Sequence, residues 1–298
     1  MTFSDHIHYF KDLFKDRCLT AEPDLQRYGS DETEDLCFPP QLVLKPETTE
    51  EVSGIMKYCN QHEIPVTPSG ARTGLSGGAL PIKGGVLLSM ERFHSILDID
   101  EKNHQVTTEP GVITQVLQEA VREKGLFYPP DPASKGSCFI GGNVAENSGG
   151  PKAVKYGVTL DYVLNLEVVL PNDEVIWTGA HVLKNATGYN LTQLIVGSEG
   201  TLAVVTKIVL KLIPHPTHDA LLLVPFFSAE QACEAVAAIF RAGITPSGLE
   251  FMERDALVWA QEFTQDFTIK VEDNHEAHLL IEVDGNDAAV IMQECESI

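Results

Sequence analysis

Residues 68–78 read PSGARTGLSGG and directly follow an apolar strand predicted at residues 64–67. Glycine adopts positive φ and lets other groups approach the backbone closely. The glycines of this stretch can therefore turn several N–H groups toward one anion. The spacing of Gly70, Gly74 and Gly77 is not the GxGxxG of a Rossmann fold, and the stretch has no Gly-Lys-Ser/Thr of a P-loop. The loop alone leaves two interpretations open: a phosphate-binding nest or a flexible surface hairpin.

A second glycine-rich segment, residues 136–157, reads GSCFIGGNVAENSGGPKAVKYG. Asn143, Asn147 and Ser148 supply hydrogen-bond donors and acceptors of the kind that the edge of a flavin ring needs, and two lysines follow them. Two such loops in one chain, each next to a strand, favour one large, planar, phosphorylated ligand over two unrelated hairpins.

The rest of the chain alternates between predicted helices and strands. Around the first loop we expect a helix at 3–17, an irregular lead-in at 18–40, a strand at 42–44, and a helix that a capping box at Thr48–Glu51 begins. Further strands are predicted at 86–89, 96–100, 105–109, 163–170, 174–178 and 202–213, with a helix at 113–121. VGSEGTL at 196–202 is by itself typical of a tight turn. After a linker at Pro214–Pro216 the pattern is strand 220–226, helix 229–242, strand 247–252, helix 253–262, strand 278–283 and a helix from about 286.

Composition limits the classes of function. The 298 residues carry 43 acidic and 21 basic side chains, a formal net charge of -22. This charge argues against a general affinity for nucleic acid or anionic membranes. It does not oppose a diphosphate that backbone N–H groups hold. The six cysteines lie far apart without a CxxC, which predicts reduced thiols and a cytoplasmic location. The N-terminus does not have the pattern of a signal peptide, and no apolar stretch is long enough to span a membrane.

Three stretches, in this order, resemble the FAD-linked oxidases of the vanillyl-alcohol oxidase/p-cresol methylhydroxylase (PCMH) type. They are PSGARTGLSGGALP, PPDPASKGSCFIGGNVAENSGGPKAVKYG and KNATGYNLTQLIVGSEGTLAVVTKIVLKLIP. The resemblance covers about residues 38–298 and is nearest to the group of glycolate oxidase catalytic subunits, D-lactate dehydrogenases and D-2-hydroxyglutarate dehydrogenases. It implies an α+β fold with an N-terminal helix and lead-in (1–37), an FAD-binding PCMH-type domain (38–216, subdomains about 38–95 and 96–216) and the first part of a ferredoxin-like cap domain (217–298).

The resemblance also implies which residues contact FAD. The first loop would wrap the diphosphate, the second segment would pass the ribityl chain and the ring, and the third stretch would flank the adenine or the sugar. The residues implied are Pro68, Ser69, Gly70, Ala71, Arg72, Thr73, Gly74, Ser76, Pro130, Asp131, Ser137, Gly141, Gly142, Asn143, Gly149, Glu199, Gly200 and Val205. Some relatives bind flavin covalently through a histidine after the first loop. Residues 68–84 contain no histidine, so we expect FAD to be non-covalent.

The implied reaction is hydride transfer from a D-2-hydroxy acid, of the glycolate or D-lactate class, to flavin N5. Such a reaction needs a base for the hydroxyl proton and a cation for the carboxylate. The family's later histidine motifs, which imply a divalent metal, are absent from this sequence, and we predict no catalytic residue and no metal ligand within it. His275 and His278 have i, i+3 spacing but lie in an acidic stretch that we expect to be exposed.

Two other functions stay open at this stage. A flavin reductase similar to UDP-N-acetylenolpyruvoylglucosamine reductase fits the residues of these motifs less well. A non-catalytic FAD-binding subunit, or a fragment of a larger oxidase complex, fits a chain whose last predicted helix has no terminating signal. We expect a longer protein, with an electron acceptor or an iron–sulfur subunit as a partner.

Overall fold

The structure is a computed structural model that describes residues 2–298. The chain divides into two compact units. The first contains the residues up to Tyr128 together with Pro132–Ser148 and Val158–Pro214. The second contains Pro129–Asp131, Gly149–Gly157 and His215–Ile298. The domain limits expected from the sequence stay a prediction, and two short pieces of the predicted FAD-binding domain group here with the C-terminal unit.

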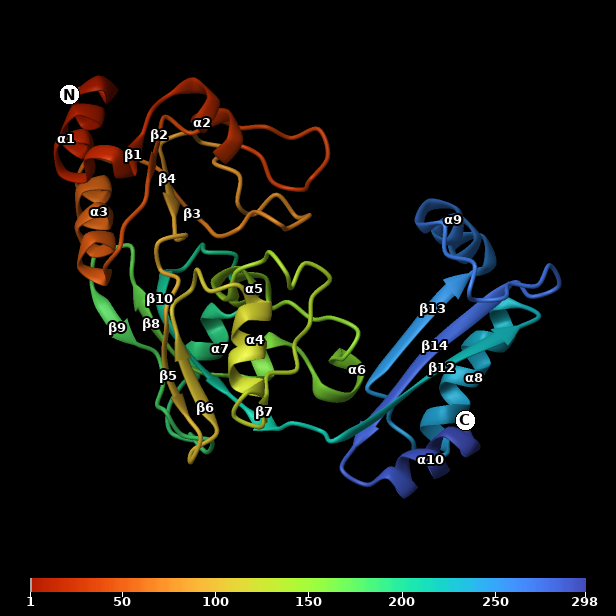
Figure 1. Ribbon diagram of the computed structural model, residues 1–298. Coiled ribbons are helices and arrows are strands. Elements are labelled where there is room, and N and C mark those ends of the chain that lie inside the picture. The colour runs from red at the N-terminus through yellow and green to blue at the C-terminus, as the bar shows by residue number, and fades with distance from the viewer. Residues whose placement is uncertain (1) are drawn as a thin grey trace. The chain divides into compact units, whose positions relative to one another are not determined.

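A small, mostly parallel sheet forms the N-terminal part of the first unit (Figure 1). Its strands β1 (Cys18–Leu19), β2 (Leu42–Leu44), β4 (Val86–Ser89) and β3 (Val66–Ser69) lie in the order β1-β2-β4-β3. Both β2 and β3 run parallel to β4. Every residue of β2 and β4 is buried, as is typical of parallel strands covered on both faces. The end of β3 leads straight into the first glycine loop, residues 68–78.

Three helices accompany this sheet: α1 (Phe3–Phe14), α2 (Glu22–Tyr28) and α3 (Thr49–Gln61). Phe10 and Phe14 of α1 pack with Ile55 and Cys59 of α3 and with the strand residue Leu42 in one core. A short 3-10 helix, η1 (Lys15–Arg17), extends α1. The sequence predicted an irregular lead-in at 18–40. This prediction is wrong in part, because β1 and α2 form within that stretch.

The second sheet of this unit is antiparallel throughout. Strands β5 (Ile96–Asp100), β6 (Gln105–Thr108), β10 (Val204–Lys211), β8 (Val163–Val169) and β9 (Val175–Trp177) lie in the order β5-β6-β10-β8-β9. Around it are α4 (Thr114–Arg122), α5 (Ile140–Glu146), α7 (Leu191–Ile195), the 3-10 helix η2 (Thr159–Asp161) and the pair β7 (Leu126–Phe127) and β11 (Ile213–Pro214). The second glycine segment, residues 136–157, is thus not only loop: it contains α5 and α6 (Ala153–Tyr156).

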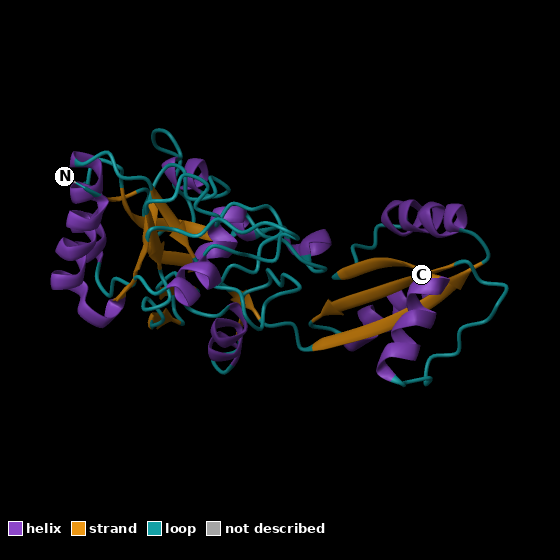
Figure 2. Ribbon diagram, turned by 90° about the horizontal axis from the view of Figure 1, so that it is seen from above, coloured by secondary structure: helices purple, strands orange, loops and turns teal. Residues whose placement is uncertain are grey.

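The second unit is built on a three-stranded antiparallel sheet. Strands β12 (His218–Phe226), β14 (Ala277–Gly285) and β13 (Gly248–Glu253) lie in the order β12-β14-β13. Helix α8 (Ala229–Arg241) connects β12 to β13, so β14 lies between two strands joined by a helix, the split β-α-β arrangement of ferredoxin-like folds. Helices α8 and α10 (Ala288–Ser297) pack on the sheet, and α9 (Arg254–Thr264) lies apart from them (Figure 2). The α+β fold expected from the sequence is confirmed.

Two smaller expectations need correction. Thr48 does cap α3, because its side chain accepts a hydrogen bond from Glu51 N, but the Glu51 carboxylate binds Arg17 and Glu47 N instead of closing the box. His278 is not exposed: it lies buried in β14, and its ring centroid is 6.2 Å from that of His275. Within residues 2–298, no helix is long and apolar enough to cross a membrane.

Candidate functional site

A cavity of about 170 Å³ lies within the first unit, between the first glycine loop, α5 and the turn at residues 197–200. Fourteen predicted site residues line it: Pro68, Ser69, Gly70, Ala71, Arg72, Thr73, Gly74, Ser76, Gly141, Gly142, Asn143, Glu199, Gly200 and Val205. Three stretches far apart in the sequence therefore meet around one space. Pockets for whole organic ligands usually occupy about 300–1,000 Å³, so this cavity accommodates a section of an extended ligand.

The first glycine loop forms one wall. Gly77 and the non-glycine Arg72 both have positive φ, at 75° and 59°. Positive φ is unusual for a residue with a side chain and is often found at ligand clamps. A side chain added at Gly74 would meet no atom within 4 Å, so it would project into open space at the cavity. The Ser69 hydroxyl is buried at this wall without a hydrogen-bond partner among the described residues. A buried hydroxyl of this kind is free to bind water or a ligand that enters the cavity.

Arg72 is the only basic side chain among the described residues that line the cavity. Its guanidinium carbon lies 4.3 Å from the centroid of the Tyr28 ring. Burial lowers the pKa of Arg72 below its ordinary value, although an arginine stays charged at any physiological pH. No carboxylate of residues 2–298 forms an ion pair with it.

Helix α5 forms the opposite wall, and its two glycines have different surroundings. A Cβ at Gly141 would lie 2.5 Å from Pro110 Cβ, so this glycine is required by close packing. A Cβ at Gly142 would meet nothing within 4 Å, and Gly142 lines the cavity. The Asn143 amide was expected at the flavin edge. Asn143 lines the cavity, and its Nδ2 donates to Thr114 Oγ1 at 2.5 Å, which uses one of its two N–H donors within the protein.

The turn at 197–200 brings the Glu199 carboxylate to the cavity, near that of Glu146 at the end of α5. Gly197 N and Glu199 N donate to Val144 O and Ala145 O, which fixes the turn against α5. The Glu146 and Glu199 carboxylates both approach Gly78, at 3.1 and 2.9 Å from a Cβ built there. Burial, and next the Glu199 carboxylate, raise the pKa of Glu146 above its ordinary value. These acidic groups would repel an anion in the cavity at long range, whereas Arg72 is the basic side chain among the described lining residues.

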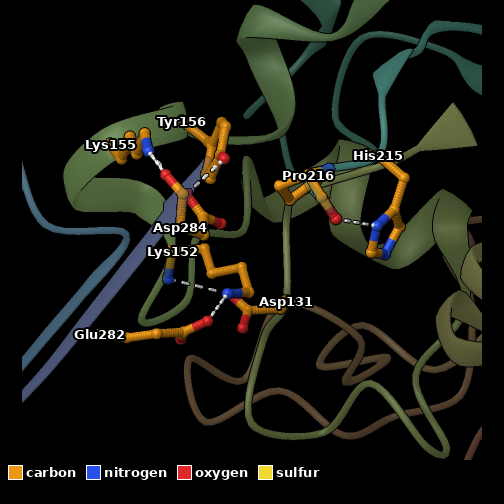
Figure 3. Close-up of polar contacts among 8 residues, drawn as sticks. All are labelled: Asp131, Lys152, Lys155, Tyr156, His215, Pro216, Glu282 and Asp284. Atoms are coloured by element: carbon orange, nitrogen blue, oxygen red, sulfur yellow. Dashed lines mark hydrogen bonds and ion pairs between the residues drawn. The ribbon is translucent and has the colours of Figure 1, made fainter. Parts of the chain in front are cut away.

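Four predicted residues do not line the cavity. Ser137 Oγ donates to Ser134 O on the surface. Pro130, Asp131 and Gly149 belong to the second unit, where Asp131 Oδ1 accepts from Lys152 N at 3.1 Å (Figure 3). The Asp131 carboxylate therefore supports the turn at residues 150–152.

The same region holds two ion pairs within the second unit. Lys152 Nζ and Glu282 Oε1 are 2.6 Å apart, and Lys155 Nζ and Asp284 Oδ1 are also 2.6 Å apart (Figure 3). The Tyr156 hydroxyl also donates a hydrogen bond to Asp284 Oδ1, at 2.8 Å. The two lysines that follow the second loop are thus paired with carboxylates of β14 and are not free to bind an anion.

Sequence reasoning missed several lining residues. Asp31 lies in the lead-in, where no motif marks it, while Cys138, Phe139 and Glu146 stand inside the second glycine segment and could have been named from it. Tyr189, in the third stretch that carries the resemblance, is 95% exposed and does not line the cavity. Residues 2–298 contain no group of three or more His, Cys, Asp or Glu residues arranged to hold a metal ion.

These features fit an extended dinucleotide. A phosphate can bind backbone N–H groups of the first loop and the single cation, Arg72. Gly74 and Gly142 leave open space where side chains would otherwise project, and Ser69 has a free hydroxyl. Fold and cavity together define a nucleotide-cofactor-binding α+β protein.

Comparison with known proteins identifies the family. Residues 40–179 match an FAD binding domain, and residues 215–298 match the C-terminal domain of FAD linked oxidases. The chain belongs to the FAD-linked oxidases, and FAD is the cofactor of this pair of domains.

The chain is 43% identical over 258 residues to glycolate oxidase subunit GlcD of Bacillus subtilis (strain 168), covering 87% of this chain and 54% of that protein. It is 42% identical over 250 residues to D-lactate dehydrogenase of Anaerostipes hadrus, covering 83% and 52%. The chain therefore spans about half the length of these relatives.

Two solved structures share the fold. Alkyldihydroxyacetonephosphate synthase has a TM-score of 0.84 and 18% identity, covering 100% of this chain and 58% of that one. Substrate-bound p-cresol methylhydroxylase has a TM-score of 0.79 and 21% identity, covering 99% and 62%. The expected PCMH-type fold is confirmed.

Proposed function

We propose that this chain is the cofactor-binding part of an FAD-dependent oxidoreductase that converts a D-2-hydroxy acid, of the glycolate or D-lactate class, to the 2-oxo acid. Bound FAD would accept the hydride at N5. The observation that carries the proposal is the meeting of three predicted motifs around one cavity with an unpartnered serine and a single cation. The names of relatives at about 40% identity support the class of substrate and do not separate its members.

The residues of the chain would act as holders of the cofactor. Backbone N–H groups of the first loop and the Arg72 guanidinium would bind the diphosphate. Gly142 would allow the nucleotide to lie directly against α5. No histidine stands among the described lining residues or at 68–84, which supports non-covalent binding. All six cysteines are free, which supports a reducing compartment, and we propose the cytoplasm.

A second candidate is an FAD-binding subunit that does not itself catalyse. The described lining residues include no histidine, lysine or tyrosine, so the carboxylates of Asp31, Glu146 and Glu199 are the groups there that could take the hydroxyl proton. The relative from Bacillus subtilis is named as a subunit, so a partner subunit or a separate electron acceptor is part of this proposal.

Two measurements test the proposal. FAD titrated into the protein should quench flavin fluorescence to saturation and raise the Tm. The loaded protein is then mixed anaerobically with glycolate, D-lactate or D-2-hydroxyglutarate, with L-lactate as the control. Loss of flavin absorbance near 450 nm with a D-2-hydroxy acid supports catalysis. Saturable FAD binding without bleaching by any of the acids favours the second candidate, and absence of FAD binding overturns both.

A further inference from the structure

Arg72 is held in the cavity wall by a residue outside the matched FAD binding domain. That domain begins at residue 40, whereas the Arg72 guanidinium lies over the ring of Tyr28, at the end of α2. Among residues 2–298 no carboxylate or carbonyl oxygen accepts a hydrogen bond from this guanidinium. A half-buried cation that stacks on an aromatic face, and that donates no hydrogen bond to another described residue, has its N–H donors available for an anion.

Tyr28 is itself fixed on several sides. It is 3% exposed and packs with Val43 and Leu87. Its hydroxyl donates to Glu91 Oε2 at 2.7 Å, and Lys45 Nζ lies 2.7 Å from Glu91 Oε1. The ring is therefore a rigid platform, anchored in the core of the parallel sheet from which the first glycine loop emerges.

The segment that follows Tyr28 also reaches the cavity. Asp31 lines it. Phe38 N donates to Gly29 O at 2.8 Å, and a Cβ at Gly29 would lie 2.7 Å from Pro39 N, so residues 29–39 form a closed loop. The lead-in thus contributes a platform and a lining residue to the cofactor site.

We propose that Tyr28 is a positioning residue for the cofactor, whose ring holds the Arg72 guanidinium at the cavity wall so that the arginine binds the diphosphate of FAD. The planar guanidinium can form two parallel hydrogen bonds to phosphate oxygens. Stacking on a fixed ring orients it before the nucleotide arrives, so less side-chain freedom is lost on binding. This inference rests on the proposed binding of FAD in the cavity.

The test compares nucleotide binding by calorimetry with three probes: FAD, ADP and riboflavin. ADP carries the diphosphate without the flavin, and riboflavin carries the flavin without phosphate. We expect Arg72→Leu to weaken FAD and ADP binding by about tenfold to a hundredfold, as for the loss of one charge-assisted contact, and to leave riboflavin unchanged. Tyr28→Leu should weaken the same two probes by about fivefold. In the Tyr28→Leu/Arg72→Leu double variant the loss should be no larger than in Arg72→Leu alone.

Because Tyr28 is buried, Tyr28→Leu also changes the packing. Two further substitutions at position 28 therefore keep the shape of the ring. Tyr28→Phe keeps the ring and should bind ADP within about twofold of wild type. Pentafluorophenylalanine at position 28 has nearly the same shape but a reversed ring quadrupole, and should bind ADP like Tyr28→Leu. Phe14→Leu is the matched control, because Arg17 lies 5.2 Å from the centroid of that ring, in the core that joins α1 and α3. It should change no binding constant.

Several results would overturn the inference. Equal losses for ADP and riboflavin in Tyr28→Leu would mean that Tyr28 only supports the wall. Additive losses in the double variant would mean that the two residues act independently, and a loss confined to riboflavin in Arg72→Leu would place the arginine at the flavin. If the variants bind FAD like wild type, the inference fails while the proposed function stands. If wild type binds no FAD, the proposed function itself fails.

Discussion

Gly141 and Gly142 are neighbours in α5, yet each lacks a side chain for its own reason. At Gly142 nothing lies within 4 Å of an added Cβ, the φ angle is not positive, and the residue lines the cavity. Glycine inside a helix costs about 1 kcal/mol relative to alanine. Gly142→Ala should therefore stabilise the cofactor-free protein by about 0.5–1 kcal/mol and weaken FAD binding at least tenfold, measured by denaturant unfolding and by fluorescence titration.

Two other glycines serve as controls for this prediction. Gly54 is exposed in α3, away from the cavity, with nothing within 4 Å of an added Cβ. Gly54→Ala should give the same stabilisation with unchanged FAD affinity. Gly141→Ala should instead destabilise by about 1–3 kcal/mol, because the new methyl group would overlap Pro110. If Gly142→Ala binds FAD as tightly as Gly54→Ala, the nucleotide does not pass this face of α5.

For single residues, the sequence predicts which ones reach the cavity better than it predicts which partners their side chains bind. The motifs identify Ser69 and Asn143 equally, and both reach the cavity lining. Only the structure shows that the Asn143 amide donates one hydrogen bond to Thr114, while the Ser69 hydroxyl has no partner among the described residues. Side-chain partners far along the chain decide this difference, and glycine spacing carries no information about them.

At the scale of elements, the start of α3 shows a pH-sensitive link. Arg17 donates two hydrogen bonds to the Glu51 carboxylate, at 2.6 and 2.7 Å. The Arg17 hydrogen bonds, with further help from Glu47 N, hold the pKa of Glu51 below its ordinary value. A carboxyl whose pKa is lower in the folded state stabilises the fold above its unfolded pKa of about 4.3, and the contribution disappears as pH falls through the folded pKa.

We therefore expect Glu51→Gln to destabilise the protein by about 1–2 kcal/mol at pH 7, the range of a charge-assisted contact. The difference from wild type should shrink steadily below about pH 4, where wild type also loses the charge. Urea unfolding at a series of pH values measures this. Glu50→Gln, an exposed neighbour in the same turn, should change stability by less than about 0.5 kcal/mol at every pH. A loss of stability in Glu51→Gln that does not change with pH would show that the shape of the Glu51 side chain, and not its charge, stabilises the start of α3.

The long, periodic helices were predictable, whereas the short helices α2 and α5 were not. The helices α3, α4 and α8 and the strands of the C-terminal sheet follow their hydrophobic patterns closely. Helix α2 has seven residues and no side-chain cap, and α5 contains two glycines. Helices this short are marginal alone and form through tertiary packing. Their sequences therefore carry little signal of a helix. Helix α5, which forms one wall of the cavity, was expected to be a loop.

At the scale of the whole molecule, the second glycine segment is divided between the two compact units. Residues up to Ser148 belong to the first unit, and Gly149–Gly157 belongs to the second. The pairing of Lys152 and Lys155 with β14 joins residues about 130 positions apart. A motif read along the chain presents the segment as continuous, so the sequence could not show that its lysines are held by the C-terminal sheet.

Asp284 is the centre of this attachment. Its side chain is 2% exposed and accepts hydrogen bonds from Lys155 Nζ and from the Tyr156 hydroxyl. Asp284→Asn keeps the volume but leaves the Lys155 ammonium without its counter-charge. Because Lys155 is 28% exposed, solvent reduces the penalty, and we expect a local cost of about 2 kcal/mol. Amide hydrogen exchange in α6 should then be about thirtyfold faster, since each 1.4 kcal/mol is a factor of ten.

A surface pair separates this effect from a general effect of charge. Lys57 and Asp173 are 3.4 Å apart, and the lysine side chain is 61% exposed. Exposed pairs contribute little, so Asp173→Asn should leave the exchange of Tyr156 N and Gly157 N, both hydrogen-bonded within α6, unchanged. Equal exchange at these two amides in Asp284→Asn and wild type would mean that backbone packing alone, such as Gly150 against the Asp131 carbonyl, retains residues 149–157. Faster exchange confined to these two amides would show that carboxylates of the C-terminal sheet hold residues 149–157. The preceding part of the same glycine segment lines the cavity.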